Sequence, residues 1–122
     1  MESTCIRALA DETQIRRCKK KIENVGSDLS DLAIIIGLIG NDTRLKILYL
    51  IQSENRLCVC DLSDILGMTV PAISQQLRKL KDRGIISSER EGTVIYYSLT
   101  KKYLETVTSV LTNGTIKNLI EQ

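Results

Sequence analysis

Residues 58–82 read CVCDLSDILGMTVPAISQQLRKLKD, a pair of short helical patterns separated by a glycine. The first pattern spans residues 58–66 and ends at Gly67, and the second spans residues 70–82 after Thr69, a favoured N-cap residue. Apolar residues recur at helical spacing in both patterns, so one face of each helix is expected to lie in the core. These inward residues are Leu62, Ile65 and Leu66, followed by Ile73, Leu77 and Leu80.

Two β-patterns follow this pair of helices. Residues 85–90 and 93–99 are rich in β-branched and aromatic residues, and Glu91-Gly92 between them is typical of a hairpin turn. A helix, a tight turn, a second helix and a two-stranded wing, in that order, predict a winged helix-turn-helix. The fold class is therefore expected to be mainly α with a β-hairpin wing.

The flanking segments are expected to be helical. Residues 3–22 predict a charged helix, which a break at Gly26-Ser27-Asp28 separates from the next. Residues 29–39 are apolar nearly all round, which predicts a helix central to the core. The remaining helical patterns span residues 43–53, 101–111 and 116–120.

The length and composition suit one soluble domain, since the chain has 122 residues and 43% of them are hydrophobic. We expect a single winged helix-turn-helix domain over residues 1–122. Its parts are an N-terminal helical arm at 1–27, the helix-turn-helix at 58–83, the wing at 85–99 and a C-terminal dimerisation helix at 100–120.

The composition also argues against several function classes. The chain has no histidine, which removes histidine-based acid–base catalysis, and an enzyme is not expected. The longest apolar run, residues 32–39, is too short to span a bilayer, and Met1-Glu2-Ser3 lacks the basic start and apolar stretch of a signal peptide. We therefore expect a cytoplasmic protein with no membrane partner and no organic cofactor.

Basic residues are concentrated at the helix-turn-helix and the wing. Residues 69–102 hold seven Lys/Arg against three Asp/Glu, although the whole chain carries only +2. A basic stripe on a positioned helix is typical of a phosphate-binding module, so helix 70–82 is expected to enter the major groove of double-stranded operator DNA. The expected contacts are base reading by Ser74, Gln75 and Gln76, phosphate binding by Arg78, Lys79 and Lys81, and backbone or minor-groove contact by Arg90. A module that contacts only proteins is the alternative.

A homodimer is also expected, because modules of this kind usually bind palindromic half-sites as two-fold dimers. The first helix and an apolar stripe on the last helix are the candidate dimer surface. Packing within the chain would explain this stripe equally well. It consists of Leu104, Val107 and Leu111.

The four cysteines, Cys5, Cys18, Cys58 and Cys60, are candidate metal ligands. Four thiols without any imidazole favour an all-sulfur site for a thiophilic ion. Residues i and i+2 do not face each other on a regular helix, so Cys58 and Cys60 can share one ion only if their helix begins at or after them or is distorted there. One of this pair can instead be a small buried apolar residue, and Cys18 is either a fourth ligand or inert.

The chain resembles the ArsR/SmtB family of metal-sensing winged-helix repressors over residues 28–111. The Cys-x-Cys motif is similar to that of the thiolate-sensing branches, which are the arsenite sensors and the cadmium/lead sensors called CadC. The N-terminal extension with Cys5 is similar to the CadC branch. The resemblance is carried by Leu57-Cys58-Val59-Cys60-Asp61-Leu62, Ser74-Gln75-Gln76-Leu77-Arg78, Gly84-Ile85-Ile86, Arg90-Glu91-Gly92 and Tyr96-Tyr97-Ser98-Leu99.

This resemblance implies a homodimeric repressor that binds operator DNA when metal-free and releases it when cysteine thiolates bind Cd, Pb, Hg or As(III). It implies that Cys58 and Cys60 are sensing ligands and that Cys5, on the arm of the other subunit, joins them. The chain departs from the CadC pattern at Cys18, because that branch has its arm cysteines one helical turn apart, and a three-sulfur site suited to lead, arsenite or mercury would follow. A second site known from some relatives is not expected at Thr100-Lys101-Lys102-Tyr103, which contains no histidine.

The same cysteines also allow a different function, a thiol redox switch. In that case Cys58 or Cys60 would form a disulfide with a cysteine of the arm. A thiol enzyme is disfavoured, because the chain has no histidine to activate a cysteine.

Overall fold

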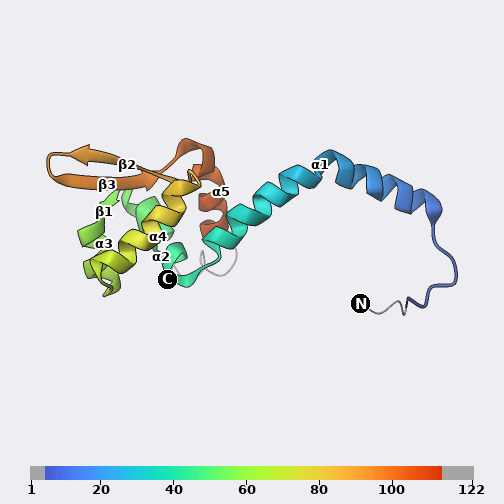
Figure 1. The fold of residues 1–122 in the computed structure, drawn as a ribbon, viewed down its shortest axis with the longest axis horizontal. Helices are drawn as coiled ribbons and strands as arrows, with labels where there is room; N and C mark the ends of the chain where they lie inside the picture. Colours follow the sequence, from blue (N-terminus) through green and yellow to red (C-terminus); the bar gives the residue numbers. More distant parts are fainter. Residues whose placement is uncertain (1–4, 114–122) are drawn as a thin grey trace. The chain divides into compact units, whose positions relative to one another are not determined.

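The computed structural model describes residues 5–113, and its internal contacts divide the chain into two units, residues 1–35 and 36–122. Each unit is described by itself. The first contains an N-terminal segment and most of helix α1 (Glu12–Ile39), whose last residues belong to the second (Figure 1). That the two units form the predicted single domain stays a prediction, and the helical pattern over 116–120 lies outside the described residues.

Helix α1 is uninterrupted, so the predicted break at Gly26-Ser27-Asp28 is wrong. The helix also begins later than predicted, at Glu12, because Asp11 caps it: the Asp11 Oδ1 accepts a hydrogen bond from the backbone N–H of Gln14 at 3.0 Å. A glycine inside a helix costs only about 1 kcal/mol relative to alanine. This cost is too small to end a long helix at Gly26.

The apolar C-terminal part of α1 is not central to the core, contrary to the prediction. Only two of its large apolar residues are buried, Ile35 and Ile39. A helix that is apolar all round can be buried only where neighbouring elements surround it. The residues that stay 44–55% exposed are Leu29, Leu32, Ile34 and Ile36.

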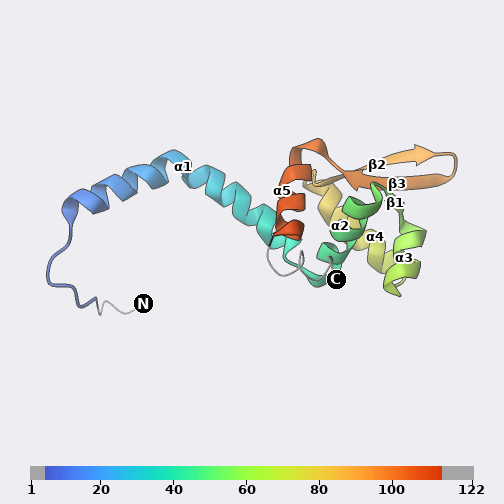
Figure 2. The same ribbon diagram turned by 180° about the vertical axis from the view of Figure 1, so that it is seen from behind.

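The second unit contains the other helices and one sheet. Strand β3 is central in this antiparallel sheet, with β2 on one side and β1 on the other. Figures 1 and 2 show the β2–β3 hairpin projecting past the helices, with α2 and α4 between α3 and α5. The mainly α fold with a β-hairpin wing is confirmed. The elements are α2 (Asp42–Glu54), β1 (Leu57–Cys58), α3 (Val59–Leu66), α4 (Val70–Asp82), β2 (Ile86–Glu91), β3 (Val94–Leu99) and α5 (Lys101–Thr112).

The faces of α3 and α4 that the helical spacing predicts contribute Leu62, Ile73, Leu77 and Leu80 to the core of the second unit. One predicted core residue is wrong: Ile65 is 54% exposed in the last turn of α3. Helical spacing shows which face of a short helix is apolar, but not where the elements beneath that face end. The fully buried residues are Ile47, Leu48, Ile51, Leu62, Ile73, Leu77, Leu80, Ile85, Ile86, Val107 and Leu111.

Two glycines form the turns of the helix-turn-helix and the wing. Gly67 ends α3 in the left-handed conformation, with φ 66°, and its N–H donates a hydrogen bond to the carbonyl of Ser63. Gly92, with φ 65°, begins a two-residue turn between Glu91 and Val94, which pair in the ladder. This turn is one residue later than the predicted one, because pairing extends β2 as far as Glu91.

Replacing Gly67 with alanine is expected to destabilise the protein by about 1 kcal/mol, because a left-handed φ is strained for a residue with a Cβ. The matched control is Gly37→Ala in the middle of α1, where an added Cβ meets no atom within 4 Å. This control is expected to be at least as stable as the unmodified chain. Urea unfolding followed by circular dichroism measures both, and equal midpoints for the two variants would contradict the left-handed turn.

Candidate metal centre and nucleic-acid interface

Helix α4 presents most of the residues that were predicted to contact DNA. It begins where Thr69 caps it, the Thr69 Oγ1 accepting a hydrogen bond from the N–H of Ala72 at 3.2 Å, with Pro71 in the first turn. Its apolar face is buried, so the opposite face is left for polar contacts. Gln76 is partly buried, and the exposed candidates are Ser74, Gln75, Arg78, Lys79 and Lys81, together with Arg90 on β2.

Gln76 is held by a residue that the sequence did not single out. Arg44 Nη1 donates a hydrogen bond to Gln76 Oε1 at 2.7 Å, and Arg44 Nε donates to the carbonyl of Leu38 at 2.6 Å. Arg44 therefore links the last turn of α1 to α4. A bidentate contact with adenine uses both the oxygen and the nitrogen of a glutamine amide, and here the oxygen already accepts from Arg44. We expect Gln76 to orient α4 and Gln75 to contribute more to base reading.

A hollow beside α4 has the chemistry of a phosphate site. It is lined by Ser74, Arg78, Lys81, Asp82 and Tyr97. Two cations and two hydroxyl groups can donate to phosphate oxygens, whereas the carboxylate of Asp82 opposes an anion. Tyr97 belongs to β3 and was not among the predicted contacts, because no local pattern shows that this strand and α4 share a hollow.

Arg56 connects the segment before Cys58 with the tip of the wing. Its guanidinium donates two hydrogen bonds to the carboxylate of Glu91, one of them from Nη2 to Oε1 at 3.2 Å. Its Cζ lies 4.0 Å from the centroid of the Tyr96 ring. The hydrogen bond from Arg56 lowers the pKa of the Glu91 carboxyl, as expected for a carboxylate that accepts from a cation.

Cys58 and Cys60 lie on either side of the point where β1 becomes α3. Cys58 ends the strand in an extended conformation, with φ −93° and ψ 166°, and is partly buried, whereas Cys60 is exposed in the first turn of the helix. The helix therefore begins between the two cysteines, and the geometric objection to a shared ion does not apply. Cys58 occupies the N-cap position but makes no side-chain cap hydrogen bond. A serine or an aspartate would cap α3 better by about 1 kcal/mol, so the thiol has no evident role in holding this helix.

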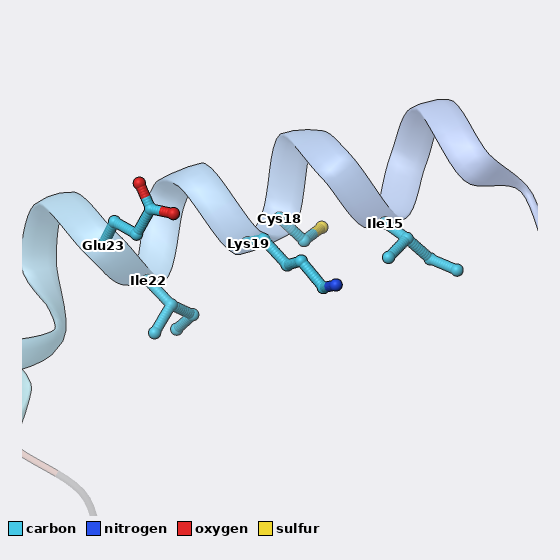
Figure 3. Close-up of a pocket in the computed structure, with 5 residues that line it drawn as sticks. All are labelled: Ile15, Cys18, Lys19, Ile22 and Glu23. Atoms are coloured by element: carbon cyan, nitrogen blue, oxygen red, sulfur yellow. The ribbon is translucent and has the colours of Figure 1, made fainter.

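The other two cysteines belong to the first unit. Cys5 is exposed in the segment before α1, and Cys18 is exposed on α1 between Ile15 and Ile22, which line one side of the helix (Figure 3). All four thiols are free of disulfides. Within residues 5–113 of one chain, no group of three or more Cys, Asp or Glu side chains is placed to hold a metal ion. The predicted four-cysteine site therefore stays a prediction.

Comparison with known proteins adds independent support for the family. Residues 41–88 match the family described as bacterial regulatory protein, arsR family. A cadmium resistance transcriptional regulatory protein, CadC homolog, from Staphylococcus aureus is 34% identical over 77% of this chain and 76% of its own length. The chain belongs to the ArsR family of regulators. The predicted family and its regulatory function are confirmed, and the family is one of DNA-binding regulators rather than enzymes.

Solved structures of ArsR-type regulators share this fold. The antimony-specific repressor AntR matches with a TM-score of 0.65 and 29% identity over 79% of this chain and 86% of its own. The homodimeric winged helix-turn-helix domain of Mb0332 from Mycobacterium bovis, a possible ArsR-family regulator, matches with a TM-score of 0.62 and 25% identity. The match covers 72% of this chain and 81% of the Mb0332 domain. The winged-helix assignment is thereby confirmed. None of the helices described between residues 5 and 113 is long and apolar enough to cross a membrane.

Two of the three apolar residues predicted for the dimer surface of this ArsR-family chain are unavailable. Val107 and Leu111 are fully buried within the second unit, so the alternative of core packing holds for both. Leu104 is 47% exposed on α5 and stays a candidate. Three apolar residues at helical spacing can point to one side, yet the depth of each depends on which elements cover it.

If Gln76 orients α4 through Arg44, the two residues are expected to act as a unit in DNA binding. The double variant Arg44→Lys/Gln76→Ala should lose less affinity than the sum of its single variants, because Gln76→Ala already removes the acceptor of the hydrogen bond that Arg44→Lys alters. Fluorescence anisotropy with a duplex selected by the unmodified protein from a random library measures this. Arg44→Lys combined with Gln75→Ala is the control and should be additive, and additive losses in both pairs would contradict the orienting role.

Proposed function

We propose that this chain is a metal-responsive transcriptional repressor. It binds operator DNA as a homodimer in the metal-free state and leaves it when cysteine thiolates bind a thiophilic ion. The observation that carries the proposal is the position of Cys58 and Cys60 at the start of α3, an element that packs on α4 and follows the strand paired with the wing. The names of the CadC homolog and of the antimony-specific AntR agree with repression of this kind.

The DNA-binding surface consists of α4, the hollow beside it and the wing. Ser74 and Gln75 read base edges, and Gln76 sets the orientation of the helix. Arg78 and Lys81 bind a backbone phosphate in the hollow, where the hydroxyl of Tyr97 is a further donor. Two more exposed cations, Lys79 and Arg90, take neighbouring phosphates or the minor groove.

The ion site is a three-sulfur set formed by Cys58, Cys60 and Cys5. The first two are placed at the β1–α3 junction, and Cys5 lies in the segment that precedes α1. Thiolates are soft ligands, so the set binds thiophilic ions such as Cd(II), Pb(II), Hg(II) or As(III) and not hard cations. Three sulfurs suit Pb(II), Hg(II) or As(III) better than Cd(II), which prefers a tetrahedral site. A bound ion would hold these three segments together. The coupling between ion binding and DNA binding then runs through the protein itself.

Cys18 has a different role in this proposal. Apolar residues recur along α1 at alternating spacings of three and four, the pattern of the a and d positions of a coiled coil. Cys18 occupies one of these positions and is therefore assigned to the seam between two copies of α1, not to the ion site. The repeat consists of Ile15, Cys18, Ile22, Val25, Leu29 and Leu32.

A second copy of the chain is the proposed partner for the exposed apolar residues. The second unit adds an apolar hollow at the junction of α1, α2 and α5, lined by residues that include Ile36, Leu45 and Val110. Large apolar patches left exposed on a soluble protein mark interaction sites, and a heptad repeat is complementary to a second copy of itself. Leu104, which is 47% exposed on α5, is a further apolar candidate on the second unit.

Ion binding and DNA binding are coupled through α3. A movement of its first turn shifts α4, because the two helices share a close-packed core at Leu62. Coupling free energies between such sites are typically about 1–3 kcal/mol, which corresponds to a DNA affinity weakened about 5- to 150-fold. The same coupling requires DNA to weaken ion binding by an equal factor.

Cys58→Ser is expected to abolish ion-induced release of DNA while leaving metal-free DNA binding unchanged, because it removes a thiolate but no DNA contact. Cys18→Ser is the matched control and should release DNA as the unmodified chain does. Gel-shift titrations with Cd(II), Pb(II), Hg(II) and As(III), paired with the ultraviolet absorption of metal–thiolate bonds, measure both steps. Unchanged release by Cys58→Ser would remove the sensing role. Release caused by peroxide but by none of the ions would instead favour the redox switch.

Arg78→Gln is expected to weaken DNA binding to all sequences and to reduce the slope of log affinity against log salt concentration by about 1, because one phosphate contact is lost. Gln75→Ala is the control, since it changes no charge and should alter sequence preference at an unchanged slope. Anisotropy titrations over a range of salt concentrations measure both. An unaltered slope for Arg78→Gln would place this residue outside the interface.

A further inference from the structure

Arg56 stands at the meeting point of the proposed ion site and the wing. It precedes Cys58 by two residues, and its guanidinium stacks on Tyr96, the residue that pairs with Cys58 across the β1–β3 ladder. The same guanidinium holds both carboxylate oxygens of Glu91, at the end of β2. One side chain thus contacts both strands of the wing next to a proposed ion ligand.

The two contacts of Arg56 restrict the orientation of its guanidinium group. A guanidinium that binds a carboxylate through two parallel hydrogen bonds is fixed in its plane, unlike a single-point ammonium contact. The ring of Tyr96 lies against the face of the guanidinium and restricts it further. A change in the backbone at Cys58 is therefore expected to disturb these contacts, because only one residue separates Arg56 from Cys58.

The wing tip carries charge that depends on this contact. Glu91 follows Arg90, the wing residue proposed to contact DNA, and it precedes the turn at Gly92. While Arg56 holds Glu91, its carboxylate is balanced by a cation. Once the contact is broken, an unbalanced carboxylate lies beside Arg90, where it opposes the approach of a DNA phosphate.

We propose that Arg56 is a positioning residue that transmits ion binding at Cys58 and Cys60 to the wing, by giving up its contacts with Glu91 and Tyr96. The inference rests on the proposed function and extends it, because it assigns a second route to DNA besides the packing of α3 on α4. Exposed ion pairs add little to stability, and both partners here are about half exposed. Loss of the contact should therefore alter coupling far more than folding.

The test compares Arg56→Gln and Glu91→Gln with the unmodified chain. Both are expected to reduce the ion-induced loss of DNA affinity by about 2- to 30-fold, the range expected for residues that modulate coupling between sites. Their metal-free DNA affinities are expected to differ: Arg56→Gln weakens binding because Glu91 loses its cation, whereas Glu91→Gln binds as tightly as the unmodified chain or more tightly. If Arg56 only stabilised the fold, the two variants would not change metal-free DNA affinity in opposite directions.

Two controls separate the wing contact from general effects of charge. Lys46→Gln breaks another exposed ion pair, Lys46–Asp42 at 2.9 Å on α2, and should leave the coupling unchanged. Tyr96→Phe keeps the aromatic ring under Arg56 and should also keep the coupling. Urea unfolding of each variant tests whether the fold is retained. If Arg56→Gln does not fold, Glu91→Gln by itself tests whether the wing contact transmits ion binding.

The measurements are anisotropy of a duplex selected from a random library, with Cd(II), Pb(II), Hg(II) or As(III) added alone, and ion affinity from metal–thiolate absorption. The inference is overturned if Glu91→Gln and Arg56→Gln release DNA by the same factor as the unmodified chain. It is also overturned if their ion affinities fall in proportion to the lost release, since the effect then belongs to the ion site. If the unmodified chain releases DNA with none of these ions, the proposed function itself fails.

Discussion

Helix α3 packs against α4, and the strand just before it pairs with β3, so one short segment contacts both of the elements that we propose bind DNA. Leu62 of α3 is fully buried, and Gly67 allows the chain to turn directly into α4. Cys58 and Cys60 lie at the opposite end of α3 from that turn. Because a close-packed core does not absorb displacement, our proposal places the bound ion at the start of α3, where it can act on α4.

The long helix α1 poses a different physical problem. Its apolar residues leave much of their surface exposed in one copy of the chain, at a cost of about 25 cal/mol for each Å² of apolar surface. The regular three- and four-residue spacing means that this surface forms one stripe, which a second helix of the same sequence can cover. In the proposed dimer, Cys18 lies in the seam between the two helices, where its thiol is sheltered from ions.

Much of the candidate site was predictable from local patterns. Thr69 and Pro71 marked the start of α4, and the spacing of its apolar residues separated the DNA-facing side from the core. The Cys-x-Cys motif marked the start of α3, although the strand at Leu57–Cys58 gave no sequence signal. Local patterns failed where burial depends on neighbours, as at Ile65 and in the second half of α1.

The sequence by itself determined the helix-turn-helix and the wing, the family and the chemistry of the thiols, because caps, glycine turns and side-chain spacing act within a few residues. Only the tertiary structure decided that Arg44 holds Gln76 and that Arg56 holds Glu91. These partners are 32 and 35 residues apart along the chain, and nothing in the neighbourhood of either arginine specifies which distant side chain the fold brings to it.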